Sequence, residues 1–482
     1  MPRPDPTRLD LLLDHVRAHA GRHLASLDER PVRPAADTAE LREALGGPLP
    51  DGASDPVDVL DLLAATAERG TIATSSARFF GFVVGGALPA AMAADMLTPV
   101  WDQNAGLYVI GPVAAVAEEV ARTWLLDLLR LPPDASMAFV TGGQMANTTA
   151  LLAARHHVLA AAGWDVELDG LAGGPEVTVL AGRERHSSID RAMRQVGLGA
   201  RPVLVDVDAD GAMVPDALAA ALGDVAGPAI VCAQMGNVNT GALDPVGPLS
   251  DIAHDHGAWL HVDGAFGLWA ACLPRLRDET DGVDRADSWA VDAHKWLNVP
   301  YDAGLAVTAH PASHAAALGT DPHQSTYLQF GEGTRDAVTW TPEFSRRGRG
   351  VPVWAALRSL GRQGVIDMVE RGCAMAQRFA ELLGAQPGVH IRNFVEPGST
   401  KHAADLRPRP TVVLNQVLVG FDDIDVGRLI AAVQDDGTCW MSGTTWRGEH
   451  LMRISVSNWQ TDPGDVDRSV DAILRCHHAL RS

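Results

Sequence analysis

The chain has 482 residues, a formal net charge of −21 and a hydrophobic fraction of 46%. A chain of this length forms roughly two to four structural units, and its composition is that of an ordinary globular protein. The excess of acidic side chains argues against a nucleic-acid partner, because phosphate backbones are bound by clustered Lys and Arg.

The cysteines and the N-terminus indicate the compartment. Five cysteines are present, an odd number, and none lies in a Cys-x-x-Cys pair. A disulfide framework or a structural zinc site is therefore not expected, and a reducing compartment is the simpler interpretation. The first residues carry charges and lack a long apolar core, so no signal peptide is expected. No run reaches the roughly 18 apolar residues of a membrane span, and we expect a cytoplasmic protein.

The N-terminal part is predicted to be mostly helical. Apolar residues at near-helical spacing predict amphipathic helices over residues 8–27 and from Val57 to Glu68. Between them, the Pro- and Gly-containing stretch from Pro31 to about Pro56 predicts an extended linker with turns. The apolar, glycine-rich stretch from Phe79 to Gly86 is either the wall of a site or a packed crossing. The Ala- and Leu-rich residues 88–130 are again predicted to be helical.

In the middle of the chain, short apolar runs alternate with helical stretches such as Val214–Leu222 and Leu249–His256. This alternation predicts a mostly parallel sheet covered by helices, with its chemistry at the carboxyl ends of the strands. The predicted strands are Ala138–Val140, Val177–Leu180, Val203–Val207, Ile230–Ala233, Trp259–Val262, Ser288–Val291 and Gly304–Val307.

Beyond about residue 350 the pattern changes. A long helix is predicted from about Pro352 to Leu383. It leads into a smaller α+β segment with strands near 411–419 and 451–457.

Two side chains at predicted strand ends suit a pyridine-aldehyde cofactor. Lys295 follows a strand in the pentapeptide Asp292-Ala293-His294-Lys295-Trp296, and a buried lysine loses its charge readily and can form a Schiff base. A surface lysine is the alternative. Asp263 ends an earlier strand, 32 positions before it (295 − 263), and a carboxylate there would keep a pyridine nitrogen protonated. By itself, Asp263 is more simply a helix cap or turn residue.

Two further motifs fit the same kind of site. Residues Thr141 to Asn147 follow a strand and open a helix, and their glycines free backbone N–H groups where a helix N-terminus favours phosphate. The motif is neither a Walker loop nor the GxGxxG fingerprint, and many helices begin after two glycines. His186 could stack on a pyridine ring, although a lone histidine is more often structural. In chain order it falls between the phosphate loop and Asp263.

Together these motifs resemble the group II PLP-dependent amino-acid decarboxylases, the family of aromatic-amino-acid, histidine and glutamate decarboxylases. The likeness runs from about residue 57 to about residue 460 and includes the segments Ala91–Leu97, Ala150–Arg155 and Arg346–Arg349. It implies the α/β fold of PLP-dependent transferases, the aspartate aminotransferase-like fold type I, with a mostly parallel seven-stranded sheet.

The resemblance also implies an obligate homodimer with shared active sites. It implies a division of the chain into a helical, dimer-forming segment, a large PLP-binding domain and a smaller C-terminal α+β domain. These cover residues 1–86, 87–350 and 351–482.

The resemblance assigns roles position by position. Lys295 is expected to carry pyridoxal 5′-phosphate (PLP) as an internal aldimine, Asp263 to pair with the pyridine nitrogen and His186 to stack on the ring. No metal is expected. The other implied contacts are the backbone of Gly143 and Gln144 and the side chain of His294 at the phosphate, Ala265 under the ring, and Phe82 and Val83 in the substrate pocket.

The chain departs from the family at two places. Residues 236–241 read Gly-Asn-Val-Asn-Thr-Gly where the family often has Gly-Thr-Thr, so either Asn237 makes the cofactor contact or the contact is lost. The loop tyrosine that supplies a proton across the dimer is replaced near Ala337, and Tyr327 matches a different position. A general acid is still needed. The other candidate donors are His186, His323, Tyr301 and water.

The expected activity is decarboxylation of an L-amino acid to an amine and CO₂, and the apolar residues 79–84 favour an aromatic or aliphatic substrate. The missing tyrosine leaves open an aldehyde synthase, a carbon–carbon lyase or an aminotransferase, and a non-catalytic protein is the least favoured alternative. Arg78 could pair with an acid, but a surface position is expected for it. Arg453 either binds a carboxylate or forms an ion pair inside the small domain.

Overall fold

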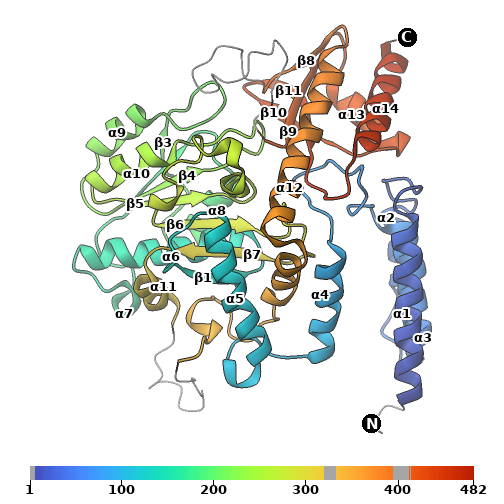
Figure 1. The fold of residues 1–482 in the computed structure, drawn as a ribbon, viewed down its shortest axis with the longest axis horizontal. Coiled ribbons are helices and arrows are strands. Elements are labelled where there is room, and N and C mark those ends of the chain that lie inside the picture. Colours follow the sequence, from blue (N-terminus) through green and yellow to red (C-terminus); the bar gives the residue numbers. More distant parts are fainter. Residues whose placement is uncertain (1–5, 320–332, 394–411, 413, 482) are drawn as a thin grey trace.

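The computed structural model describes residues 6–319, 333–393, 412 and 414–481 (Figure 1). Two sheets organise this part of the chain, one of seven strands and one of four. None of the described helices is both long enough and apolar enough to span a membrane.

Three helices form the N-terminal part, and α1 and α3 lie alongside each other at one side of the molecule (Figure 1). Helices α1 (Pro6–Ser26) and α3 (Pro56–Gly70) confirm the two predicted helices. The predicted linker was wrong in part, because α2 (Thr38–Leu45) interrupts it. Asp37 accepts from the first turn of α2 and Glu40 reaches back to the Asp37 N–H, a capping box that starts a helix even in a polar stretch.

All seven predicted runs are strands of one sheet, which confirms the predicted fold class. The sheet order is β1-β7-β6-β5-β4-β2-β3, with β7 antiparallel to both neighbours and the other pairs parallel. The carboxyl ends of β2, β4, β5 and β6 therefore share one edge. The strands are β1 (Ser136–Val140), β2 (Thr178–Gly182), β3 (Val203–Val205), β4 (Ala229–Gln234), β5 (Trp259–Asp263), β6 (Ser288–Asp292) and β7 (Gly304–Thr308).

Helices cover both faces of this sheet, which explains why its strands read as nearly continuous apolar runs. On β4, Ile230 and Cys232 pack with α6 and α8, whereas Val231 and Ala233 pack with α9 and α10. The side chains thus alternate between the two faces along the strand. The helices of this part are α6 (Gly143–Ala161), α7 (Val166–Asp169), α8 (Ser187–Gln195), α9 (Pro215–Gly223), α10 (Val246–Asp255) and α11 (Pro311–Leu318).

A long helix connects the two sheets. Helix α12 (Gly350–Gly384) packs on α4 (Pro89–Trp101) and α5 (Pro112–Leu128), and it confirms the predicted helix after residue 350. It is kinked at Gly361, whose φ of 62° lies in the left-handed region that glycine adopts without a steric cost.

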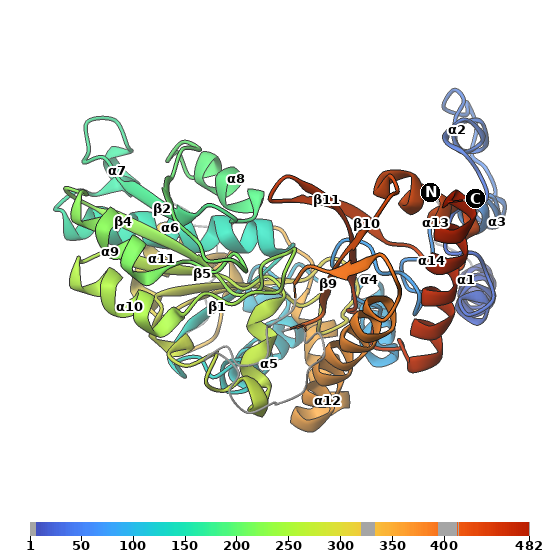
Figure 2. The same cartoon turned by 90° about the horizontal axis from the view of Figure 1, so that it is seen from above.

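The four-stranded antiparallel sheet lies beside the large sheet and follows α12 in the chain (Figure 2). Its order is β10-β11-β9-β8, and β9 and β11 correspond to the two predicted strands. Strands β8 and β10 were not predicted, because β8 is very short and β10 is rich in Ser, Gly and Thr. The elements are β8 (Val389–Ile391), β9 (Gln416–Phe421), α13 (Val426–Asp436), β10 (Ser442–Trp446), β11 (Glu449–Ser455) and α14 (Pro463–Arg481).

Candidate active site

Two buried carboxylates end adjacent parallel strands. Asp263 is the last residue of β5 and Asp292 the last residue of β6. Lys295 follows three residues later, and its Nζ lies 2.8 Å from Asp292 Oδ2. The lysine side chain is 22% exposed, so it is accessible from one side while its cation is paired. The structure thus brings Lys295 and Asp263 to the same edge of the sheet.

The glycine motif after β1 meets the same edge. Helix α6 begins at Gly143, whose N–H donates to Asp292 Oδ1, and His294 Nε2 lies 3.3 Å from the same oxygen. A Cβ at Gly143 would lie 2.8 Å from Asp292 Oδ2, and one at Gly142 would lie 2.9 Å from His294 Cε1. Glycine is required at both positions by this close approach. The side chain of Gln144 bonds to Gln195, which leaves its backbone for any contact at the helix start.

The Asp263 carboxylate is held by three donors. Its Oδ2 accepts from Asn147 Nδ2 at 3.1 Å and from Ser188 Oγ at 3.2 Å. Its Oδ1 accepts from the Ala265 N–H at 3.2 Å. These three bonds fix the orientation of the carboxylate.

His186 is linked to Asp263 through Ser188. It caps the N-terminus of α8, where its Nδ1 accepts from the Ser188 N–H and lies 2.8 Å from Ser188 Oγ. Desolvation lowers the pKa of His186, and the Asp263 charge partly opposes this. The residue remains exposed on one side, where a flat ligand could contact the imidazole.

The glycine-rich stretch from Phe79 to Gly86 touches the backbone of Lys295. A Cβ at Gly85 would lie 2.0 Å from the Lys295 carbonyl oxygen, so the two segments are in direct contact. Phe82 is 59% exposed and stacks on Trp440 with 5.7 Å between ring centroids, whereas Val83 is buried in the main core. The stretch is both a packed crossing and a wall beside Lys295.

This constellation fits the groups of PLP. The first turn of α6 offers N–H groups that lack partners within the helix, which suits a phosphate. Glycines leave room for close approach to that turn, and Lys295 and Asp263 suit an aldehyde and a pyridine nitrogen. The pyridoxal-dependent decarboxylase conserved domain matches residues 49–400.

The chain belongs to the pyridoxal-dependent decarboxylase family. It is therefore a PLP-dependent carboxy-lyase by family, as the sequence predicted. Tyrosine decarboxylase 2 of Arabidopsis thaliana is 26% identical over 96% of this chain and 85% of its own length. Phenylacetaldehyde synthase of Petunia hybrida is 26% identical over 94% of this chain and 91% of its own length. A crystal structure of Oryza sativa TDC with PLP and tryptamine covers both chains fully, with a TM-score of 0.86 and 21% identity.

The side chain of Asn237, which stands where the family often has threonine, is hydrogen-bonded to the protein backbone. Its Oδ1 accepts from the N–H groups of Asn239 and Thr240, and its Nδ2 donates to the Glu184 carbonyl. Asparagine commonly closes turns in this way. The cofactor contact expected of Asn237 stays a prediction.

Ala337, where the resemblance places the family's loop tyrosine, lies in the described part of the chain. Ala337 is buried at the start of a short 3-10 turn, Ala337–Thr339. The Tyr108 N–H donates to Asp336 Oδ1 at 2.7 Å, which brings another tyrosine to this segment. The Tyr301 ring lies 4.2 Å from the His294 ring, and partial burial and the Asp292 charge raise the pKa of Tyr301 to about 12. His323 and Tyr327 lie outside the described residues.

The two arginines are both buried, but only Arg78 lies near carboxylates of the described residues, with its Nη1 3.5 Å from Asp28 Oδ1 and 3.9 Å from Asp465 Oδ1. The surface position expected for Arg78 was wrong, because its side chain is buried and donates to the carbonyls of Thr438 and Asp28. Arg453 is also buried and donates to the Val238 carbonyl at 3.1 Å. Burial lowers the pKa of Arg453, and no carboxylate of the described residues pairs with it. The ion pair considered for the small domain is thus absent from the described part of the chain.

Three polar residues of this site carried no separate signal in the sequence. Asn147 and Asp292 stand inside motifs that drew attention for their glycines and lysine, and Ser188 follows His186 by two positions. Their roles depend on which strand ends are neighbours, and that follows from the sheet order. The one signal in the sequence that could have identified these three residues is their position inside or next to the predicted motifs.

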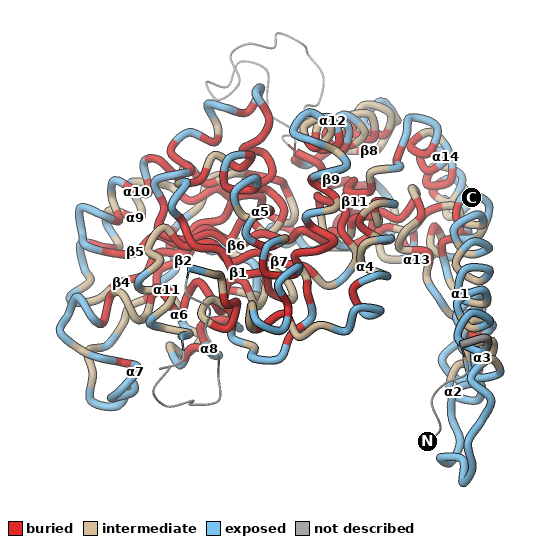
Figure 3. The backbone as a smooth tube through the Cα atoms, turned by 60° about the horizontal axis from the view of Figure 1, so that its bottom comes forward, coloured by how far each residue is buried: buried red, intermediate tan, exposed pale blue. Residues whose placement is uncertain are grey.

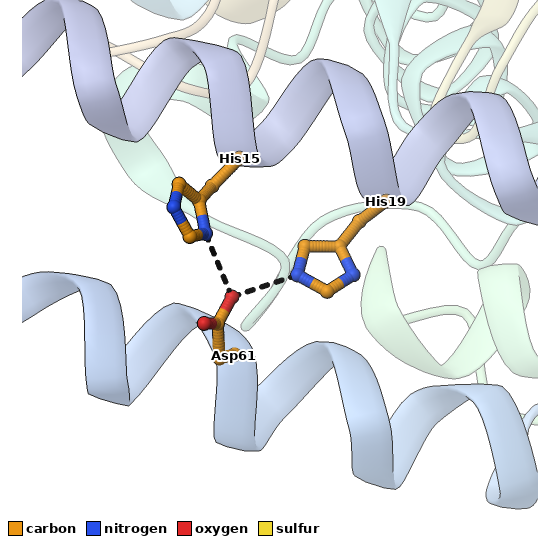
Figure 4. Close-up of side chains that lie close together, drawn as sticks. All are labelled: His15, His19 and Asp61. Atoms are coloured by element: carbon orange, nitrogen blue, oxygen red, sulfur yellow. Dashed lines mark hydrogen bonds and ion pairs between the residues drawn. The ribbon is translucent and has the colours of Figure 1, made fainter.

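A second polar cluster lies on the N-terminal helices (Figure 4). His15 Nδ1 and His19 Nε2 lie 3.0 and 2.8 Å from Asp61 Oδ1, and these bonds lower the pKa of Asp61. Arg22 lies 2.6 Å from His19 Nδ1. Because a guanidinium only donates, His19 carries its proton on Nε2 and donates to Asp61. The cluster is therefore a hydrogen-bonded clamp between α1 and α3.

Proposed function

We propose that this enzyme decarboxylates an L-amino acid with an aromatic or apolar side chain and releases CO₂ and the amine. The observation that carries the proposal is the convergence of Lys295, Asp263 and the start of α6 at one edge of the sheet. The names of the relatives, which refer to tyrosine and phenylacetaldehyde, support an aromatic substrate.

Each residue has a task in this proposal. Lys295 holds the aldehyde carbon of PLP, and Asp292 orients its amine. The first turn of α6, with the backbone of Gly143 and Gln144, and His294 would bind the phosphate. The Gly143 N–H would exchange Asp292 Oδ1 for a phosphate oxygen. When bound, PLP supplies an electron-accepting ring.

The ring is held from three sides in this proposal. Asp263 would hold the proton of the ring nitrogen, and His186 and Ala265 would contact the two faces of the ring. The Asn237 amide remains a proposed neighbour of the cofactor. All of these contacts are proposed for the enzyme with PLP bound.

Substrate binding is proposed to use Arg453 and the wall beside Lys295. A buried arginine without a paired carboxylate suits the carboxylate of an amino acid, because burial strengthens a charge-assisted hydrogen bond. Phe82, exposed and stacked on Trp440, supplies apolar surface for the side chain, and Val83 shapes the pocket only from within the core.

A second outcome is favoured by Ala337. Without a tyrosine there, the substrate carbon left after CO₂ release lacks its usual general acid. Oxygen can then take two electrons, so that amino acid, O₂ and water give aldehyde, CO₂, ammonia and hydrogen peroxide. Tyr301 and Tyr108 are the described phenols that could instead supply the proton.

We also propose that the enzyme is a homodimer with shared sites and that residues 1–86 form its dimer segment, residues 87–350 the large domain and residues 351–482 the small domain. Helices α1 and α3 are exposed over most of their length (Figure 3). Their exposed apolar side chains support the dimer, because soluble monomers rarely expose such patches. The most exposed apolar side chains on α1 and α3 are Leu9, Leu11, Leu13, Val59, Leu62 and Leu63. Five free cysteines support a reducing, cytoplasmic setting.

The test is a product analysis of PLP-loaded enzyme with a panel of amino acids, in air and under argon, beside Lys295→Ala. Equal amounts of amine in both atmospheres support decarboxylation, and aldehyde with peroxide in air alone supports the second outcome. No CO₂ from any amino acid, or equal CO₂ from Lys295→Ala, would refute the proposal. Sedimentation of the enzyme as a monomer would refute the dimer.

A further inference from the structure

A chain of buried hydrogen bonds runs from Asp263 into the sheet. Asp263 Oδ2 accepts from Asn147 Nδ2, and Asn147 Oδ1 lies 2.9 Å from His261 Nε2. His261 Nδ1 lies 2.9 Å from Ser288 Oγ, which in turn lies 2.9 Å from Trp259 Nε1. All five side chains are buried, so water does not compete for these bonds.

The strands place these residues on one face. Residues 259, 261 and 263 are every second residue of β5, so their side chains point to the same side of the sheet. Helix α6, which carries Asn147, covers this side. Ser288 is the register partner of His261 on β6. The opposite face of β5 carries Leu260 and Val262, both in the main core. Polar character is thus confined to the face that ends in Asp263.

The two ends of the chain fix the direction of every hydrogen bond. The Trp259 indole N–H only donates, and an ionised Asp263 carboxylate only accepts. Asn147 therefore turns its Nδ2 to Asp263 and its Oδ1 to His261. That orientation requires a proton on His261 Nε2.

The remaining links follow from a neutral His261. Burial lowers the pKa of His261 to about 4, with partial opposition from the Asp263 charge, so the imidazole is neutral near pH 7. Its Nδ1 then accepts from the Ser288 hydroxyl, whose oxygen accepts from Trp259. Every N–H and O–H of the chain points toward Asp263, and bonds aligned in this way polarise one another.

We propose that His261 is a positioning residue that fixes the Asn147 amide, so that its Nδ2 faces Asp263 and supports the charge of that carboxylate. Without the His261 donor, the Asn147 Oδ1 loses its buried partner, and the amide is held only through its Nδ2, by Asp263 and Ser188. The inference rests on the proposed function in one respect, the location of Asp263 at the nitrogen of the cofactor ring. His261 is fully buried, and it acts on Asp263 only through Asn147.

The test compares His261→Leu and His261→Gln in PLP-loaded enzyme, with His314→Leu as the matched control. His314 is also buried, also bonded to a serine, Ser136, and also has a pKa lowered to about 4 by burial. Its other nitrogen bonds to the Trp340 carbonyl. The readouts are the visible absorption spectrum of bound PLP, the rate of PLP release, kcat, KM and the melting temperature.

We expect His261→Leu to change the spectrum, to speed PLP release and to lower kcat about five- to tenfold with little change in KM. His261→Gln, which can donate to Asn147 from a similar place, restores most of these properties. His314→Leu lowers the melting temperature and leaves spectrum, release and kcat as in the wild type. Ser288→Ala removes the next hydrogen bond of the chain. It should lower kcat about twofold, with smaller changes of the spectrum and of the PLP release rate.

Two results would overturn the positioning role. One is a folded His261→Leu enzyme with the wild-type spectrum and release rate, and the other is an equal change in His314→Leu. If His261→Leu does not fold, Ser288→Ala decides by the same readouts, because it removes a single hydroxyl. A wild-type enzyme that binds PLP but releases no CO₂ would refute the proposed function and not the positioning role. The spectra of the His261 variants would still test that role.

Discussion

Acid stability should depend on His314, a buried histidine in α11 that is not part of the Lys295 site. Its Nδ1 lies 2.8 Å from Ser136 Oγ and its Nε2 lies 3.0 Å from the Trp340 carbonyl oxygen. Since a carbonyl only accepts, Nε2 carries the proton and the neutral ring is satisfied. Burial, and then the Arg335 charge, lower the pKa of His314 from 6.5 to about 4.

The sign of the effect follows from this lowered pKa. As pH falls, the unfolded chain takes up the proton near 6.5, before the folded chain does near 4. The contribution of neutral His314 to stability is therefore complete above 6.5 and is lost as pH falls toward 4. Between about pH 7.5 and about pH 5, the free energy of unfolding should fall by about 2 kcal/mol from this residue.

The assay measures urea unfolding of wild type and His314→Gln at these two pH values, with tryptophan fluorescence as the signal. The substitution removes the titrating ring and keeps a polar side chain. We expect the variant to lose about 2 kcal/mol less than the wild type between the two pH values, whatever its stability at the higher pH. An equal loss in both proteins would refute the linkage between His314 and acid stability.

Three further substitutions test the site. Gly85→Ala should weaken PLP binding at least about tenfold in a titration of apoenzyme, because its Cβ would lie 2.0 Å from the Lys295 carbonyl oxygen. The control Gly52→Ala, where a Cβ meets nothing within 4 Å, should bind PLP as the wild type does. Arg453→Met should raise KM for the amino acid about tenfold or more in steady-state assays and change kcat less, and an unchanged KM would exclude a carboxylate contact. Tyr301→Phe should raise the ratio of aldehyde to amine in air, and an unchanged ratio would exclude its phenol as the proton donor.

The large sheet could be predicted from the sequence because its strands are buried on both faces. Runs such as Ile230–Ala233 carry a signal that does not depend on neighbours. Strand β10 carries no such signal. Gly443 and Thr445 are exposed on it and Ser442 and Thr444 are half-buried, so its place is set by pairing with β11. Arg78 was misjudged for the same reason, since the carbonyls of Thr438 and Asp28 that accept from it come from distant segments.

The candidate site was predictable to the level of motifs. Lys295, Asp263 and the glycines before α6 stand next to strands, and strand ends meet at one edge in any parallel sheet. The partner of Lys295 was not predictable, because Asp292 could equally have faced away. Nor was the contact between Asn147 and His261, 114 positions apart, which depends on α6 crossing the face of β5.

A local departure from the hydrophobic pattern is itself informative in this chain. His261 and Ser288 stand in strands that are buried throughout, where an unpaired polar group costs about 1–3 kcal/mol. A core of this size could fill both positions with apolar side chains, as Leu260 and Val262 do on the opposite face. The polar pair is satisfied only because Trp259 and Asn147 complete a chain that ends at Asp263. These polar residues break the hydrophobic pattern of their strands, but all are hydrogen-bonded and the chain ends at one carboxylate. A site that depends on the charge of that carboxylate requires such an arrangement.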